Sequence, residues 1–206
     1  MASISKRCLF AFSYIAIKLA TLFIIAGCNG AGKTTASFTV LPELLKIKEF
    51  VNADEIAKGL SPFQPETVAI EAGKIMLKRI KELIDQRVDF AFETTLASKS
   101  FVSLSKQAQA KGYQICLTYF WLDSTELAIA RVQQRVLEGG HNIPTDTIIR
   151  RYYAGLKNFI NLYKSIVDYW IFIDNSSAEQ ELIAEGKRNE PPIILNQIKW
   201  HIISTV

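Results

Sequence analysis

Apolar runs and amphipathic stretches alternate along this chain of 206 residues. The run at 113–122 is nearly continuously apolar, as expected for a strand that is covered on both faces of a sheet. Alternation of this kind is typical of βα units arranged around a parallel sheet. We therefore predict an α/β fold in which helices flank five parallel strands, at residues 19–26, 49–54, 88–93, 113–122 and 169–174.

Helical periodicity marks the segments between these strands. From Pro65 to about residue 86, apolar residues recur at helical spacing, and proline suits the first helical position. Asp123 or Ser124 is the expected cap of the helix that follows the fourth strand, which ends at a Gly-Gly pair. Thr145 is the expected cap of the next helix. Further helices are expected from the glycine-rich loop to about Leu45, from the third strand to about Lys111, and at 146–166.

The N-terminus requires a decision between a targeting segment and part of the fold. Residues 8–27 are almost wholly apolar and follow Lys6 and Arg7, as in a signal peptide or a short membrane span. However, no small-x-small cleavage site interrupts the run, and its second half is needed as the first strand. We expect residues 1–17 to be an apolar appendage or an over-long start, with no membrane segment. The remainder is expected to form a main domain at 18–176 and a polar connector with a C-terminal packing segment at 177–206, whose residues 193–205 form a last helix or strand.

The composition is that of an ordinary globular protein and does not indicate nucleic-acid binding or a metal centre. Apolar residues make up 49% of the chain and charged residues 21%, which is an ordinary globular balance. The net charge of +4 is too small and too dispersed to indicate nucleic-acid binding. The three cysteines have no metal-binding spacing and indicate a reducing, cytoplasmic compartment, and two histidines are too few for a histidine-based metal centre.

The segment GCNGAGKTT contains the pattern Gly-x-x-x-x-Gly-Lys-Thr between an apolar strand and a helix. Glycines let the backbone turn so that N–H groups surround a phosphate at the start of a helix. Lys33 is expected to reach the β- and γ-phosphates, and the Thr34 hydroxyl is expected to bind Mg²⁺. We therefore predict an ATP site formed by Gly27, Asn29, Gly30, Ala31, Gly32, Lys33, Thr34 and Thr35.

Two acidic residues are expected at the carboxyl ends of strands beside this loop. Asp54 ends the second predicted strand and Glu93 ends the third. One carboxylate there can accept a proton from an attacking hydroxyl, and the other can hold the acceptor or a water bound to Mg²⁺. The alternative for Asp54 is a helix cap before EIAKG. Asp123, with Glu126 after it, is more typical of a helix cap than of a catalytic acid.

Basic residues gather after the fourth strand. Arg131 and Arg135 lie four residues apart, hence on one helix face, and Arg150 and Arg151 follow in the next helix. The segment EGGHNIP, with His141, joins the two helices. Arginines on a lid would neutralise the charge that spreads over the equatorial oxygens of a transferring phosphoryl group. The alternative is a solvated helix face.

Other classes of nucleotide-binding protein lack support. An LSGG-like signature and a strand ending in Asp-Glu, which a transporter-type or repair ATPase needs, are absent, and so is the Asn-Lys-x-Asp of a GTPase. The pattern favours phosphoryl transfer to a small hydroxyl acceptor, and a regulatory ATPase without an acceptor is the alternative.

A string of motifs over residues 20–176 resembles the zeta toxin family, especially its short, stand-alone branch. The motifs are GCNGAGKTT, NADEIAKGLSP, FAFETTLASKSF, KGYQICLTYFWLDSTELAIARVQQRVLEGGHNIP, RRYYAGLKNF and IDNS. The resemblance implies a P-loop kinase with an adenylate-kinase-like sheet that uses ATP and Mg²⁺. It also implies UDP-N-acetylglucosamine as the acceptor, phosphorylated at the 3′-hydroxyl of the sugar, and another small hydroxyl compound is the alternative acceptor. A helical antitoxin that covers the nucleotide site is the implied partner.

The same resemblance implies roles for single residues. Lys33 and Thr34 would bind ATP and Mg²⁺, and Asp54 would be the base on the sugar hydroxyl. Glu93 and Thr95 would hold the substrate. Arg131 would clamp the transferring phosphate, and the second clamp of the family falls near His141, so that Arg150 or Arg151 is the alternative. We assign catalysis to Lys33, Asp54, Arg131 and Arg151, and substrate binding to Glu93, Thr95, Arg135, His141 and Arg150.

Overall fold

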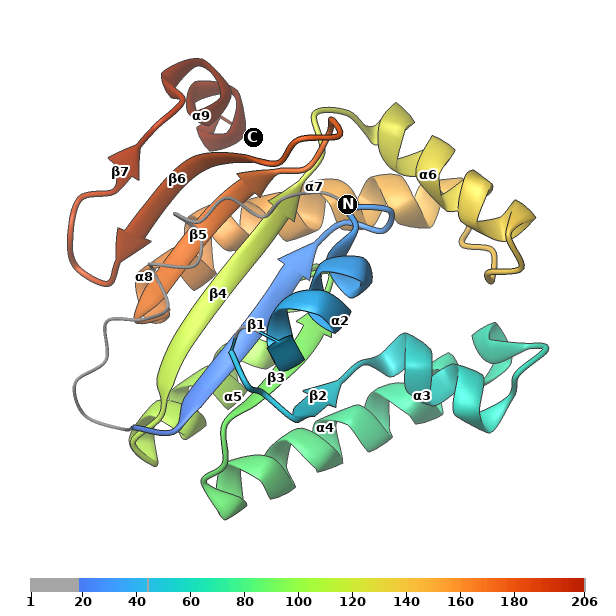
Figure 1. The fold of residues 1–206 in the computed structure, drawn as a ribbon, viewed down its shortest axis with the longest axis horizontal. Coiled ribbons are helices and arrows are strands. Elements are labelled where there is room, and N and C mark those ends of the chain that lie inside the picture. Colours follow the sequence, from blue (N-terminus) through green and yellow to red (C-terminus); the bar gives the residue numbers. More distant parts are fainter. Residues whose placement is uncertain (1–18, 44, 206) are drawn as a thin grey trace.

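The computed structural model describes residues 19–43 and 45–205, so the predicted appendage at 1–17 lies outside the described part. A sheet forms the centre of the molecule, with strands in the order β2-β3-β1-β4-β5-β6-β7 (Figure 1). Neighbours among the first five strands are parallel, whereas β6 and β7 are antiparallel to their neighbours. The strand bounds are Thr21–Gly27 for β1, Glu49–Val51 for β2, Phe90–Thr94 for β3, Gln114–Trp121 for β4, Tyr169–Asp174 for β5, Glu181–Lys187 for β6 and Ile193–Ile194 for β7.

The predicted α/β fold is confirmed, but the prediction of a purely parallel five-stranded sheet is wrong. The sheet is mixed and has seven strands. Strand β6 has the polar sequence ELIAEGK, and only part of it is buried. Its residue Gly186 pairs with Trp170, whose ring would lie 2.6 Å from a Cβ at this position. Gly186 at this contact and the charged residues Glu181, Glu185 and Lys187 leave the strand with only a short apolar segment, so its signal in the sequence is weak.

The helices cover both faces of the sheet. Helix α2 lies on one face, over a small core that includes Phe23 and Cys116, and α5 and α7 lie on the other face (Figure 1). That second face carries the main core, with Phe90 and Phe92 among its members. The helix bounds are Lys33–Glu43 for α2, Ala53–Leu60 for α3, Ala69–Gln86 for α4, Ser100–Ala110 for α5, Thr125–Leu137 for α6, Thr145–Asn158 for α7, Lys164–Ile166 for α8 and Gln197–Ser204 for α9, with a 3₁₀ turn at Pro65–Val68 and a π-helical turn at Phe159–Tyr163.

The helix starts confirm one predicted cap and correct two other predictions. Ser124, one of the two expected caps, accepts a hydrogen bond from the backbone of Leu127 at the start of α6. Thr145 is the first residue of α7 and not its cap, since Pro144 precedes the helix. Strand β2 ends at Val51, so Asp54 stands in the first turn of α3 and not at a strand end. Asn52 ends the strand early because its side chain caps α3, accepting from the Asp54 backbone.

Among the helices of residues 19–43 and 45–205, none combines the length and the apolar character that a membrane crossing requires.

Two helical glycines give opposite predictions for stability. A Cβ on Gly155 in α7 would lie 2.4 Å from the Thr95 carbonyl oxygen, a backbone atom that cannot move alone. Gly155→Ala should therefore lower the free energy of unfolding by about 1–3 kcal/mol. A Cβ on Gly73 in α4 would meet nothing within 4 Å, so Gly73→Ala should raise it by about 0.5–1 kcal/mol. Urea denaturation measures both, and equal effects of the two substitutions would contradict this packing of α7.

Candidate functional site

The loop between β1 and α2 has the backbone geometry of a phosphate-binding loop. Gly30 and Gly32 have positive φ angles of 80° and 77°, which other residues rarely adopt. A Cβ on Gly30 would lie 2.8 Å from the Ala128 carbonyl oxygen of α6, and a Cβ on Gly32 would lie 2.5 Å from the Asn175 side chain. Helix α2 begins directly after the loop, and a helix N-terminus attracts anions. The loop therefore combines tight packing from outside with an anion-binding helix start.

Lys33 is the buried cation of the loop. Its ammonium group donates a hydrogen bond to the Cys28 carbonyl at 2.8 Å and lies 3.6 Å from the Glu93 carboxylate. The side chain is only 6% exposed, so its charge depends on these partners for compensation. Burial raises the pKa of the neighbouring Cys28 thiol to about 11, which keeps this cysteine neutral near pH 7.

Glu93, near the end of β3, accepts hydrogen bonds from residues that follow the two neighbouring strands, β1 and β2. Thr34 donates its hydroxyl proton to the carboxylate, at 2.8 Å from Oε2 and 3.1 Å from Oε1, and Asn52 donates from Nδ2 at 2.9 Å. Because β3 lies between β2 and β1, the residues that follow those strands reach the same carboxylate. Ligands of open α/β sheets bind at this carboxyl edge.

The Thr34–Glu93 pair fits a magnesium ion. A hydroxyl has one proton and two lone pairs, and donation of the proton to Glu93 leaves the lone pairs of Thr34 available for a cation. No group of three or more candidate metal ligands exists within the described residues. Magnesium in phosphoryl-transfer sites needs no such cage, since one or two protein groups, waters and the substrate phosphates hold it.

Two pockets meet at this edge of the sheet. The first, of about 520 Å³, lies over the phosphate loop and extends to the segment 138–141. The second, of about 300 Å³, extends from β3 toward α4, α5 and α7. Four residues line both pockets, namely Asn29, Lys33, Asp54 and Glu93. The first pocket has room for nucleotide phosphates, and its lining combines four cationic residues with four carboxylates. The second pocket is a separate space next to it.

The lining of the second pocket is rich in groups that form hydrogen bonds. Hydroxyl and amide side chains come from Asn29, Asn52, Thr94, Thr95, Ser98 and Ser100. Met76, Leu77 and Phe101 add an apolar side. A ring that carries several hydroxyl groups presents both polar edges and an apolar face, so this lining suits a sugar-like molecule.

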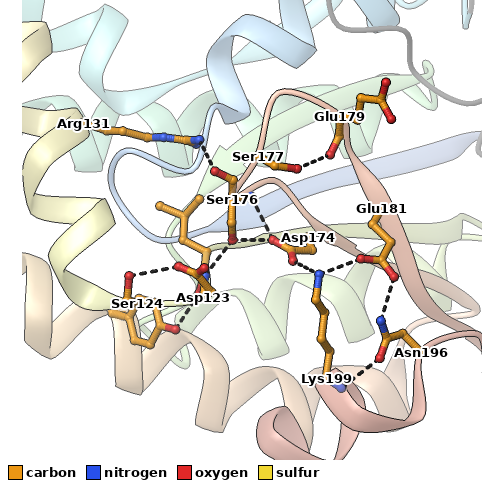
Figure 2. A network of polar contacts seen from close by, with 12 residues as sticks. Asp123, Ser124, Arg131, Asp174, Ser176, Ser177, Glu179, Glu181, Asn196 and Lys199 are labelled. Atoms are coloured by element: carbon orange, nitrogen blue, oxygen red, sulfur yellow. Dashed lines mark hydrogen bonds and ion pairs between the residues drawn. The ribbon is translucent and has the colours of Figure 1, made fainter.

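The four candidate arginines have different places. Arg131 lines the first pocket and donates to the carbonyl oxygens of Asn175 at 2.8 Å and Ser176 at 3.0 Å. Figure 2 shows Arg131 reaching toward Ser176 from α6. Arg135 lines the same pocket, and its Nε and Nη2 atoms are buried without a hydrogen-bond partner in the described part of the chain. A guanidinium in this state is suited to an anion from outside the protein.

Arg150, Arg151 and His141 were the alternatives for a second clamp. Arg150 is exposed and lines neither of the two pockets. Arg151 lines the second pocket and donates to Asn29 Oδ1 at 3.3 Å, and burial lowers the pKa of its guanidinium. His141 lines the first pocket, where burial lowers its pKa, so that the imidazole is neutral near pH 7. Neutral His141 is a weaker partner for phosphate than an arginine.

The remaining predicted residues also have definite places. Thr35 lines the first pocket and Thr95 the second, whereas Gly27 and Ala31 line neither of them. Two asparagines of the site were missed. Asn52 binds Glu93, and Asn175 donates to the Ala31 carbonyl at 2.8 Å. Asn175 directly follows the strand predicted at 169–174 and could have been identified by that position, whereas Asn52 falls inside the strand predicted at 49–54 and carried no such signal.

Comparison with known proteins gives consistent matches. The sequence profile of the family described as Zeta toxin matches residues 17–187. A protein of Haemophilus influenzae, described as uncharacterized, is 32% identical over 127 residues, which are 61% of this chain and 88% of the relative.

Solved structures show the same fold at low sequence identity. The crystal structure of AvrRxo1-ORF1:AvrRxo1-ORF2 with sulphate ions matches 90% of this chain, with a TM-score of 0.75 and 17% sequence identity. The crystal structure of the same complex with ATP also matches 90% of this chain, with a TM-score of 0.72 and 18% sequence identity. In each of these two structures, the match covers only 63% of the length of the other protein's chain. The PezAT chromosomal toxin-antitoxin system of Streptococcus pneumoniae matches 90% of this chain and 80% of its own, with a TM-score of 0.62 and 17% identity.

Substitutions of Thr34 test the magnesium assignment. Thr34→Val removes the hydroxyl and should weaken ATP binding in the presence of Mg²⁺ by about 10–100-fold, whereas Thr34→Ser keeps the hydroxyl and should stay close to the wild type. Isothermal titration calorimetry with and without EDTA measures the effect. A Thr34→Val loss that is as large in EDTA as in Mg²⁺ would contradict a metal-binding role.

Proposed function

The chain belongs to the zeta toxin family, and from this premise we propose that it is an ATP- and Mg²⁺-dependent kinase of a small hydroxyl compound. The leading acceptor is UDP-N-acetylglucosamine, phosphorylated at the 3′-hydroxyl of its sugar, as the family resemblance implies. The observation that carries the proposal is the wall shared by the two pockets, with Lys33, Asp54 and Glu93 on it. Such a wall lets a donor in one pocket react with an acceptor in the other.

ATP occupies the first pocket in this proposal. Lys33 neutralises charge on the β- and γ-phosphates, and Thr34 holds Mg²⁺, which stabilises negative charge on the phosphate oxygens when it is bound. Arg131 and Arg135 of α6 are further cations in the lining of that pocket. Their charges favour the transition state, in which negative charge spreads over the equatorial oxygens of the transferred group.

The acceptor occupies the second pocket and presents a hydroxyl group toward Asp54. The hydroxyl oxygen forms a bond to the γ-phosphorus, the bond from that phosphorus to the bridging oxygen breaks, and ADP leaves. The hydroxyl proton passes to the Asp54 carboxylate.

Asp54 is better suited as the base than Glu93. The Asp54 carboxylate accepts no hydrogen bond from any residue that the structure describes, so its lone pairs are available. Glu93 already accepts from Thr34 and Asn52 and lies near Lys33. Glu93 therefore organises the site, and Thr95 and Arg151, which line the second pocket, contact the acceptor.

A protein partner and a compartment belong to the same proposal. One structural match is named for a toxin-antitoxin system, and an antitoxin that covers the nucleotide site is the partner that the family resemblance implies. We expect the reaction in the cytoplasm, where ATP is available. No nucleic acid takes part in it.

Incubation of the protein with ATP, Mg²⁺ and a panel of hydroxyl compounds tests the proposal. The panel contains UDP-N-acetylglucosamine, other UDP-sugars and free sugars, and mass spectrometry detects a product with one added phosphoryl group. Transfer to UDP-N-acetylglucosamine is the expected result, and transfer to another compound would correct the acceptor only. Steady ATP hydrolysis without any phosphorylated acceptor would contradict the kinase assignment and favour a regulatory ATPase.

Asp54→Asn tests the base. The substitution should lower kcat by about 100-fold or more, because proton removal is lost, while the affinity for ATP stays unchanged. Asp146→Asn is the matched control, since Asp146 is an exposed residue in the first turn of α7 and lines neither pocket. Full activity of Asp54→Asn would show that another group accepts the proton.

A further inference from the structure

The turn at the carboxyl end of β5, residues 174–176, contacts several parts of the candidate site. The backbone N–H of Asn175 donates to the Trp121 carbonyl at 2.9 Å, which fixes the turn to the end of β4. Asp174 closes the turn, because its Oδ1 accepts from the backbone N–H of Ser176 at 2.8 Å and also from the Ser176 hydroxyl. The turn therefore has a defined shape before any ligand is considered (Figure 2).

The turn holds Arg131 through backbone atoms. The carbonyl oxygens of Asn175 and Ser176 each accept a hydrogen bond from one Nη atom of the guanidinium. A guanidinium has five N–H groups, so three remain for phosphate oxygens while two are held. Since Arg131 also lines the first pocket, the turn orients this cation without consuming its capacity for a ligand.

The same turn holds the phosphate loop. The Asn175 side chain donates from Nδ2 to the Ala31 carbonyl at 2.8 Å, and the space beside Gly32 is filled by that amide group. Lys33 and Thr34 follow immediately along the chain. One residue thus contacts both the loop that would bind the donor phosphates and the arginine that would clamp the transferred group.

The C-terminal helix anchors the turn from the outside. Lys199 of α9 donates to Asp174 Oδ2 and to Glu181 Oε2, both at 2.6 Å, and Asn196 donates to the other oxygen of Glu181 (Figure 2). Asp174 is only 4% exposed, so its carboxylate needs such a partner. These two hydrogen bonds raise the pKa of Lys199, which keeps it charged over the physiological range.

We propose that Asn175 is a positioning residue for phosphoryl transfer, which joins the phosphate loop and Arg131 into one rigid unit, and that Lys199 anchors its turn through Asp174. The inference rests on the proposed function, because it assigns Arg131 to the transferred phosphate. It adds a role for the C-terminal segment β6–α9, which contributes no residue to either pocket.

A double-mutant cycle tests the role of Asn175. Asn175→Ala should lower kcat by about 10–100-fold, since small misplacements of catalytic groups have effects of this size. Asn175→Ala removes the side-chain contact to the phosphate loop and keeps the backbone carbonyl that holds Arg131. In an Arg131→Met background the same substitution should cost at least about fivefold less, because the placement of the loop relative to Arg131 no longer matters once the guanidinium is absent. Additive losses, as expected from a general loss of stability, would overturn the proposal, and so would a wild-type kcat of Asn175→Ala.

Gln109→Ala is the matched control for this cycle. Gln109 also donates its side-chain amide to a backbone carbonyl at 2.8 Å, that of Ile166, but it lines neither pocket. Gln109→Ala should leave kcat unchanged whatever it does to the unfolding midpoint. If the wild type transfers no phosphoryl group to any acceptor, the proposed function fails alone. In that case the same four proteins are compared by their Kd for ATP in the presence of Mg²⁺. A deviation from additivity of about fivefold in the effects of Asn175→Ala and Arg131→Met on this Kd supports the coupling, and additive effects overturn it.

Lys199→Met tests the anchor without touching the site. It should lower kcat by about threefold or more in protein that is still folded, and Lys199→Arg should restore most of the loss, because arginine keeps the charge beside Asp174. A folded Lys199→Met variant with wild-type kcat would overturn the anchoring role of Lys199, and only the positioning role of Asn175 would then remain.

Discussion

The Glu93 carboxylate is the interaction on which the candidate site depends. A carboxylate that is 9% exposed has to be compensated, and its partners are Thr34, Asn52 and Lys33. These partners follow two different strands, so the compensation of one charge brings the phosphate loop and the start of α3 together. Asp54 lies two residues after Asn52, and its place between the two pockets follows from this arrangement.

The arginines of the site, Arg131 and Arg135, are held differently from Glu93. Arg131 is held by two backbone carbonyls, so its orientation is fixed, and no carboxylate of residues 19–43 and 45–205 forms an ion pair with it. Arg135 has buried nitrogen atoms without a partner among the described residues. A pocket that keeps cationic groups in this state favours an anionic ligand, because the ligand supplies the missing partner. The same lining also carries the carboxylates of Asp54, Glu55, Glu93 and Glu138, so the pocket would attract an anion through individually placed cations and not through a net positive charge.

Much of the fold and of the site could be predicted from the sequence. The apolar strand before the phosphate loop, the buried strand at 114–121 and the position of Glu93 all follow strong local patterns. Strand β6 could not be predicted, since charged residues and a glycine interrupt its short apolar segment and pairing with β5 and β7 stabilises it. Arg150 and Arg151 are adjacent in sequence but point about 100° apart on a helix, so only packing decides which one reaches a pocket. Asn175 acts through contacts 144 residues away, which leave no local pattern.

The central claim is that donor and acceptor are bound at the same time, on the two sides of the wall that carries Asp54 and Glu93. Initial rates of phosphoryl transfer, measured while the concentrations of ATP and acceptor are both varied, test this claim most directly. The account predicts double-reciprocal lines that intersect, because both substrates must occupy their pockets before the γ-phosphoryl group moves. Parallel lines, which indicate that ADP leaves before the acceptor binds, would contradict it.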